Sequence, residues 1–193
     1  MWKGVLDLEK HFALYGAYHR NPVNILIHTI SVWLIFFNSL VLFHFIPPLL
    51  HIPFVCGFDF NFAFASVILY ALLFVVLDKK AGSLGAVLCL LCWFGSQALT
   101  SCLGFSLAWK VVLTSQLICF TGQFIGHRVF EKRSPSLLDN LSLAFLMAPF
   151  FVLLEVLGNH FHYEPYPGFY ASVCSKIEAD RRGWQACKQK KSS

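Results

Sequence analysis

Charged residues are scarce in this chain. Asp, Glu, Lys and Arg make up 13% of its 193 residues, whereas soluble domains carry about 25%. Hydrophobic residues make up 57%, phenylalanine alone occurs 21 times, and the mean hydropathy is +0.63. A water-soluble fold of this size has too little interior to hide so much apolar surface, which excludes an ordinary soluble domain. We therefore expect an integral membrane protein whose apolar surface is solvated by lipid.

The chain also lacks the marks of a secreted or a nucleic-acid-binding protein. No small-residue cleavage site follows the first apolar run, so we expect that run to be a retained anchor rather than a signal peptide. The seven cysteines are odd in number, and four of them lie within apolar runs, which favours buried packing over a disulfide framework. The net charge of +5 is spread over loops and tail rather than along one stripe, so no nucleic-acid partner is expected.

Five apolar runs divide the chain, over residues 25–45, 60–77, 84–103, 109–125 and 141–157. The first would be about 31 Å long as a helix, which matches a hydrocarbon core of about 30 Å. The fifth is short, is expected to be broken by Pro149 and has Glu155 near its end, so a re-entrant or in-plane segment is favoured there over a full crossing. The predicted fold is an all-α polytopic membrane helix bundle, with four spans in two hairpins plus a fifth re-entrant or spanning apolar segment.

Basic residues set the expected orientation. If the first four runs form two hairpins, the cytosolic side carries most of the basic residues near the run ends, namely Lys3, Lys10, Arg20, Lys79, Lys80, Arg128, Lys132 and Arg133. The ending Lys190-Lys191-Ser192-Ser193 resembles the dilysine retrieval signal of the endoplasmic reticulum, which coat proteins read from the cytosol. We therefore predict a multi-pass protein of the endoplasmic-reticulum membrane with both termini in the cytosol. Residues 1–163 would form one membrane-embedded domain, and residues 164–193 a polar, basic tail.

Candidate metal ligands lie at the edge of the first run. Asn21 and Pro22 are a helix-start signal, with Asn21 as the cap and Pro22 at the first helical position. Asn24 and His28 are four residues apart and share one face of that helix. A break at Pro22 would let the preceding segment, residues 6–19, fold back as an amphipathic helix and bring His19 towards His28.

A second group of candidate ligands ends the fourth run. Gln123, His127 and Glu131 lie on one narrow stripe of a helix, and a polar stripe in a membrane faces protein or water. His127 and Glu131, four residues apart, can bind one metal together. Two histidines with one carboxylate suit non-haem Fe(II), and three histidines with a carboxylate nearby would serve as well. Asp139 and Glu155 are reserve carboxylates.

These residues resemble the 2-hydroxy fatty acid dioxygenase family, the small endoplasmic-reticulum membrane proteins of the Mpo-like group. The resemblance extends from about Lys10 to Leu157. It is carried by three motifs: Tyr15-x3-His19-x2-Pro22-x-Asn24-x3-His28, Gln123-Phe-Ile-Gly-His127-x3-Glu131-x3-Pro135 and Pro149-x5-Glu155.

The resemblance implies an Fe(II)-dependent enzyme of fatty acid α-oxidation. Its substrates would be molecular oxygen and the long-chain 2-hydroxy acids released in phytosphingosine breakdown, and its product a fatty acid one carbon shorter.

The resemblance also implies roles for individual residues. His19, His28 and His127 become the first choices as iron ligands, with Glu131 as a ligand or a supporting residue. Asn24 and Gln123 would orient the ligands, and Tyr15, Asp139 and Glu155 are further catalytic or supporting candidates. Arg20 and Arg128 could pair with the substrate carboxylate, because they adjoin the histidines.

Three other functions compete with this interpretation. A membrane di-iron hydroxylase or desaturase would need clustered HxxxH and HxxHH motifs, which the sequence lacks. A transporter would show more polar or broken helices at mid-membrane, and a repeat. The main alternative is a non-enzymatic hairpin protein that shapes or scaffolds the endoplasmic-reticulum membrane, which would need neither the histidines nor a metal.

Overall fold

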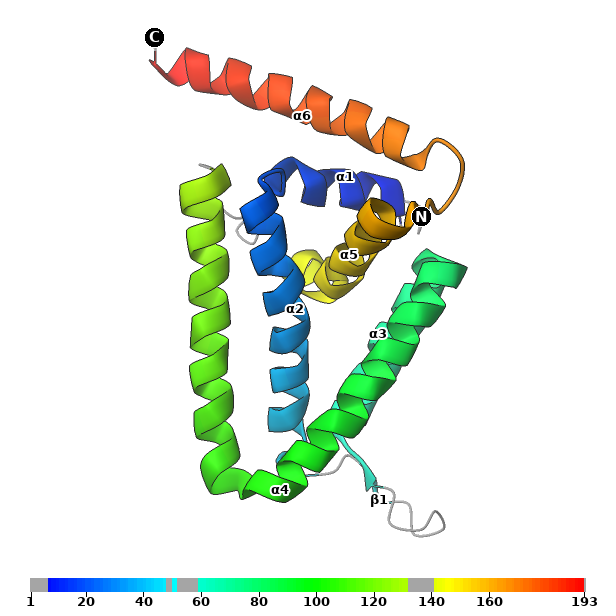
Figure 1. Ribbon diagram of the computed structural model, residues 1–193, viewed down its shortest axis with the longest axis vertical. Coiled ribbons are helices and arrows are strands. Elements are labelled where there is room, and N and C mark those ends of the chain that lie inside the picture. The colour runs from blue at the N-terminus through cyan, green and yellow to red at the C-terminus, as the bar shows by residue number, and fades with distance from the viewer. Residues whose placement is uncertain (1–6, 48–49, 52–58, 132–140, 193) are drawn as a thin grey trace.

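The computed structural model describes residues 7–47, 50–51, 59–131 and 141–192. Over these residues the chain is almost entirely helical (Figure 1), so the predicted all-helical class is confirmed. The helices are α1 (Leu8–Tyr18), α2 (Pro22–Phe43), α3 (Phe62–Leu77), α4 (Lys79–Ile125), the π-helical turn η1 (Gly126–Glu131), α5 (Leu141–Phe161) and α6 (Phe169–Ser192). Two-residue strands, β1 (Leu50–His51) and β2 (Asp59–Phe60), form a small antiparallel pair.

The chain turns sharply between α1 and α2, as the sequence predicts. The Asn21 side chain accepts a hydrogen bond from the Val23 N–H at 2.9 Å, and Pro22 occupies the first turn of α2. Pro22 has no N–H to continue α1, so the chain changes direction there. In Figure 1 α1 lies across one end of α2. This arrangement leaves His19, the residue that ends α1, beside the first turns of α2.

The third and fourth apolar runs form the two arms of α4. Gly104 separates them, with φ at 63° and ψ at 168°, a left-handed conformation that side chains beyond glycine rarely adopt. The arms therefore leave Gly104 in different directions, and α2 lies between them in Figure 1. At the other end of the first arm, Asp78 ends α3 and caps α4 by accepting from the Ala81 N–H at 2.7 Å.

Two segments are long and apolar enough to cross a membrane: α2, and the stretch Lys79–Glu131 that joins α4 to η1. In the most apolar window of the second segment only 17% of the residues are buried inside the protein. Large apolar side chains such as Leu91 and Ile118 stand exposed on it. A core helix of a soluble protein would bury such residues. The two candidate spans agree with a membrane protein, and the arrangement of four spans in two hairpins stays a prediction.

Helix α5 completes the core. It continues through Pro149 without ending, although the sequence suggested that this proline would break the segment. Phe150 and Leu154 on α5 are fully buried, and the Phe150 ring lies 5.2 Å from that of Phe74 on α3. Packing of this kind can hold a helix together across a proline that cannot donate its backbone hydrogen bond. Whether α5 crosses the membrane stays a prediction.

The polar tail, residues 164–193, contains the helix α6. Phe169 and Val173 are buried in the same core as α1. Glu9 of α1 accepts hydrogen bonds from Tyr166 and Ser172 and pairs with Lys176. The tail is thus packed on the domain that precedes it. Recognition of the C-terminal lysines by coat proteins stays a prediction.

Candidate metal centre

His19 presents one ring nitrogen as a free lone pair. Its Nδ1–H donates to the Tyr15 carbonyl at 2.8 Å, and the Tyr15 ring stacks on the imidazole at 4.0 Å. Because a carbonyl oxygen can only accept, Nδ1 carries the proton and Nε2 carries the lone pair. That Nε2 is buried and has no hydrogen-bond partner. Burial, followed by the nearby His28, holds the pKa of His19 well below its usual range, so the ring is neutral.

His28 is held in the same way on the second turn of α2. Its Nδ1–H donates to the Asn24 carbonyl at 3.0 Å, which leaves Nε2 with the lone pair. A backbone carbonyl on the second ring nitrogen is the usual means by which a ligating histidine is oriented. The buried His28 ring therefore has the tautomer and the support of a metal ligand.

His127 reaches the site from the π-helical turn η1. Its Nδ1 is buried and has no hydrogen-bond partner. The wider turn of a π-helix changes the direction of the side chains that it carries, and such turns occur frequently at functional sites. The end of the second arm of α4 thus brings a third imidazole to the two that the α1–α2 junction provides.

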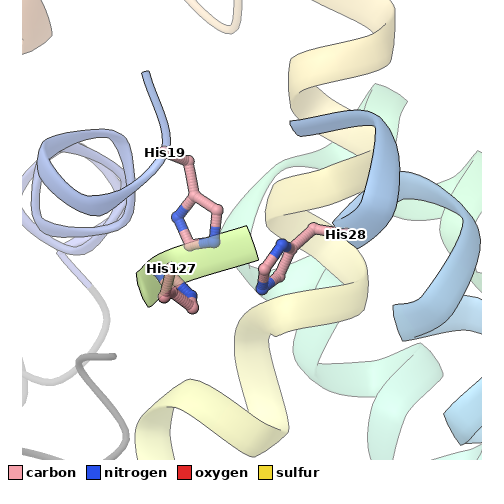
Figure 2. A group of neighbouring side chains, drawn as sticks. All are labelled: His19, His28 and His127. Carbon is pink, nitrogen blue, oxygen red and sulfur yellow. The ribbon is translucent and has the colours of Figure 1, made fainter. Parts of the chain in front are cut away.

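The three rings converge on one point, as Figure 2 shows. Their centroids lie 4.4 Å apart for His19 and His28, 4.9 Å for His19 and His127, and 4.8 Å for His28 and His127. One nitrogen from each lies within 4.8 Å of the other two, and all three residues are buried. Buried imidazole nitrogens without a hydrogen-bond partner, as in His19 and His127, are costly unless something binds them. The donor set fits a divalent metal such as iron or zinc.

Glu131 lies next to this group and connects its two halves. Its Oε1 accepts hydrogen bonds from the N–H of Arg20 at 2.7 Å, from the N–H of Asn21 at 2.8 Å and from the Asn24 side-chain amide at 3.1 Å. The carboxylate thereby ties the end of η1 to the turn between α1 and α2. Glu131 thus holds two segments of the site together. That it also binds the metal stays a prediction.

Asn24 is fully buried between the same two segments. Its amide also donates to the Tyr18 carbonyl at 3.3 Å, while its Oδ1 has no partner. The backbone of Gly126 passes so close that a Cβ there would lie 2.3 Å from this Oδ1. Sequence reasoning missed Gly126, although a glycine directly before a candidate ligand is a visible signal of a close approach.

Tyr15 and Glu155 form a second support for His19. The Tyr15 hydroxyl donates to Glu155 Oε2 at 2.7 Å and so fixes the ring that stacks on His19. Burial, with the Glu155 charge second, raises the pKa of Tyr15 well above its usual range, so the hydroxyl stays a donor. Asp139, the other reserve carboxylate, lies outside the described residues.

The remaining predicted site residues lie around the cluster. Gln123 is buried one turn before His127 and lines a cavity of about 320 Å³ that begins at the three rings. His11, which was not among the predicted site residues, lines the same cavity. Arg20 and Arg128 are both exposed, and their predicted contact with a substrate carboxylate stays a prediction.

The fold and this site define a class: a helical protein with membrane-compatible apolar helices and a buried cluster of three histidines. The chain belongs to the Mpo1-like family, since residues 5–160 match the family described as 2-hydroxy-palmitic acid dioxygenase Mpo1-like. It is 36% identical over 157 residues to the 2-hydroxy-palmitic acid dioxygenase MPO1 of Saccharomyces cerevisiae, a match that covers 81% of this chain and 83% of the yeast protein. No solved structure matches the chain.

The matched region contains all three histidines of the candidate metal centre, and the family resemblance found in the sequence is confirmed. Helix α6 begins at Phe169, beyond the residues that match the family.

Proposed function

We propose that the protein is an Fe(II)-dependent dioxygenase of long-chain 2-hydroxy fatty acids, with molecular oxygen as co-substrate and a fatty acid one carbon shorter as product. The convergence of His19, His28 and His127 is the observation that carries this proposal. Membership of a family described by a dioxygenase activity supports the reaction class, and the yeast relative supports 2-hydroxy-palmitic acid as the kind of substrate.

Each residue of the site has a defined task in this proposal. Each of the three imidazoles would hold the ion through one ring nitrogen, and His19 and His127 each have a buried nitrogen without a hydrogen-bond partner. Iron, if bound there, would mediate electron transfer from the organic substrate to molecular oxygen. Glu131 and Asn24 keep the two ligand-bearing segments together, and the pair of Tyr15 and Glu155 fixes His19.

The surroundings of the site suit an amphiphilic substrate. The cavity that begins at the histidines is lined mainly by apolar side chains, so it accepts a hydrocarbon chain while the polar head stays beside the ligands. Arg20 and Arg128, exposed near the site, would pair with the carboxylate. We place the protein in the endoplasmic-reticulum membrane as a multi-pass enzyme with cytosolic termini, in the breakdown of phytosphingosine.

The test is oxygen-dependent turnover by the full chain purified in detergent. Iron-loaded protein should convert 2-hydroxypalmitate to the acid one carbon shorter, consume oxygen in step, and leave palmitate unchanged. His127→Ala should abolish turnover, whereas His160→Ala, an exposed histidine outside the cluster, should retain it. Full turnover by His127→Ala would refute the histidine cluster as the active site. No turnover by the iron-loaded wild-type protein would refute the dioxygenase function and favour the membrane-shaping alternative.

A further inference from the structure

The cavity extends far beyond the metal centre, along one face of α2. His28, Val32, Phe36 and Phe43 of this helix all line it. From His28 to Phe43 the helix advances about 22 Å, at about 1.5 Å per residue. A volume of about 320 Å³ spread over that length describes a narrow channel rather than a round chamber.

The far end of the channel lies between the end of α2 and the start of α3. Leu40 and Phe43 line it from α2, and Ser66 lines it from α3. One turn beyond Ser66, the Tyr70 ring packs on Phe36 at 4.8 Å, which shows that the two helices run side by side at this level. The three residues are therefore several turns away from the histidines.

The polar groups at this end are already satisfied. The Ser66 hydroxyl donates to the Phe62 carbonyl at 2.7 Å, and the Ser39 hydroxyl donates to the Ile35 carbonyl at 2.8 Å. Both bonds are made within the residue's own helix, so neither serine needs a partner in the channel. An occupant of this end gains nothing from polar atoms, and an alkyl chain fits the lining best.

We propose that this channel holds the alkyl chain of the substrate and that Phe43 and Ser66 set the longest chain it accepts. The inference rests on the proposed function for the identity of the head group at the histidines. Carbon–carbon bonds of about 1.5 Å at angles of about 111° advance about 1.25 Å each. A sixteen-carbon palmitic chain is thus about 19 Å long when extended, close to the length of the channel.

The side of the channel also suits entry from lipid. Three of its lining residues, Leu14, Phe120 and Phe145, are exposed at the protein surface, and all three are apolar. They come from α1, from the second arm of α4 and from α5, so the opening lies between helices. A chain dissolved in the bilayer meets hydrocarbon-like side chains along this whole path.

Binding of saturated 2-hydroxy acids of increasing length to the detergent-purified full chain tests the inference. Affinity for the wild type should rise about fourfold per added methylene and level off when the chain reaches Phe43. Ser66→Leu should make the affinity level off about four carbons earlier, because the leucine side chain would shorten the channel by about one helical turn, or about 5.4 Å. Phe43→Ala should instead extend the rise to longer chains. Turnover of the same acids should show the same limits.

Two matched controls separate the channel from general effects on the protein. Ser83→Leu replaces an exposed serine whose hydroxyl bonds its own helix in the same way, and Leu42→Ala truncates the exposed neighbour of Phe43. Both should keep the wild-type length limit. If Ser66→Leu and Phe43→Ala both keep the wild-type chain length at which affinity levels off, the channel proposal is wrong. Shifted binding limits without any turnover in the wild type would uphold the channel and overturn the dioxygenase function.

Discussion

Glu131 accepts a hydrogen bond from the backbone N–H of Arg20 at 2.7 Å, although the two residues are 111 positions apart in the chain. The same carboxylate oxygen also accepts from the next N–H, that of Asn21. This bond joins the segment that carries His127 to the turn that carries His19. The arrangement of the candidate metal centre therefore depends on Glu131, whose Oε1 accepts hydrogen bonds from these two backbone N–H groups.

Glu131→Gln should distinguish positioning from ligation. The amide keeps one oxygen that can accept from the two backbone N–H groups, so a positioning residue would retain most of the bound iron. Glu131→Ala removes the acceptor, and loss of such a support typically lowers metal affinity about 10- to 100-fold. Iron content after dialysis against a weak chelator measures both variants. Equal, complete loss of iron in both would identify Glu131 as a ligand instead.

Gly126→Ala should disturb the site through Asn24. A Cβ at this position would lie 2.3 Å from the Asn24 Oδ1, so Asn24, His127 or both must move. We expect an approximately 10- to 100-fold loss of metal affinity, measured by titration with Fe(II). Gly122→Ala is the matched control, because its Cβ would meet only Ile27 at an ordinary 3.7 Å. If Gly126→Ala and Gly122→Ala bound Fe(II) with the same affinity, the close approach of Gly126 to Asn24 would not matter for metal binding.

Tyr15→Phe should lower the free energy of unfolding, because it leaves the Glu155 carboxylate without its donor. The expected cost is about 1–3 kcal/mol, the usual cost of a buried polar group left without a partner. Glu155→Leu should cost less when Tyr15 is already Phe than in the wild type, since both changes remove the same bond. Unfolding of the four proteins in detergent measures this coupling. Strictly additive costs would show that the bond contributes nothing.

Acid should loosen α6 from α1. Hydrogen bonds from Lys176, Ser172 and Tyr166 lower the pKa of Glu9 from 4.5 to about 2 in the folded protein. The contribution of Glu9 is therefore fully present above pH 4.5 and is lost as the pH falls towards 2. Glu9→Gln should reproduce this loss at neutral pH. The measurement is tryptic cleavage at Arg181 at neutral pH, which should be faster in Glu9→Gln than in the wild type. Glu178→Gln, which changes an exposed carboxylate on α6, is the control.

Local patterns predicted the parts of the site that depend on neighbouring residues. The cap at Asn21, the break at Pro22 and the stripe of Gln123 and His127 each follow from helix geometry alone. Together with the family resemblance, these features predicted that His19 and His28 would meet His127, which lies 99 positions after His28.

Long-range packing could not be predicted in this way. The bonds of Glu131 to the α1–α2 turn and of Tyr15 to Glu155 join residues more than a hundred positions apart. The π-helical turn at His127 and the docking of α6 on Glu9 also depend on tertiary contacts rather than on local spacing. The channel along α2 is formed by five helices together, so no single motif contains it.

Iron stoichiometry of the purified full chain tests the central claim most directly. The wild type should bind one Fe(II) per chain, and each of His19→Ala, His28→Ala and His127→Ala should lose it, because every ring contributes one nitrogen to the cluster. His160→Ala should bind iron like the wild type. Stoichiometric iron in all three cluster variants would contradict the account, since the ion would then be held elsewhere.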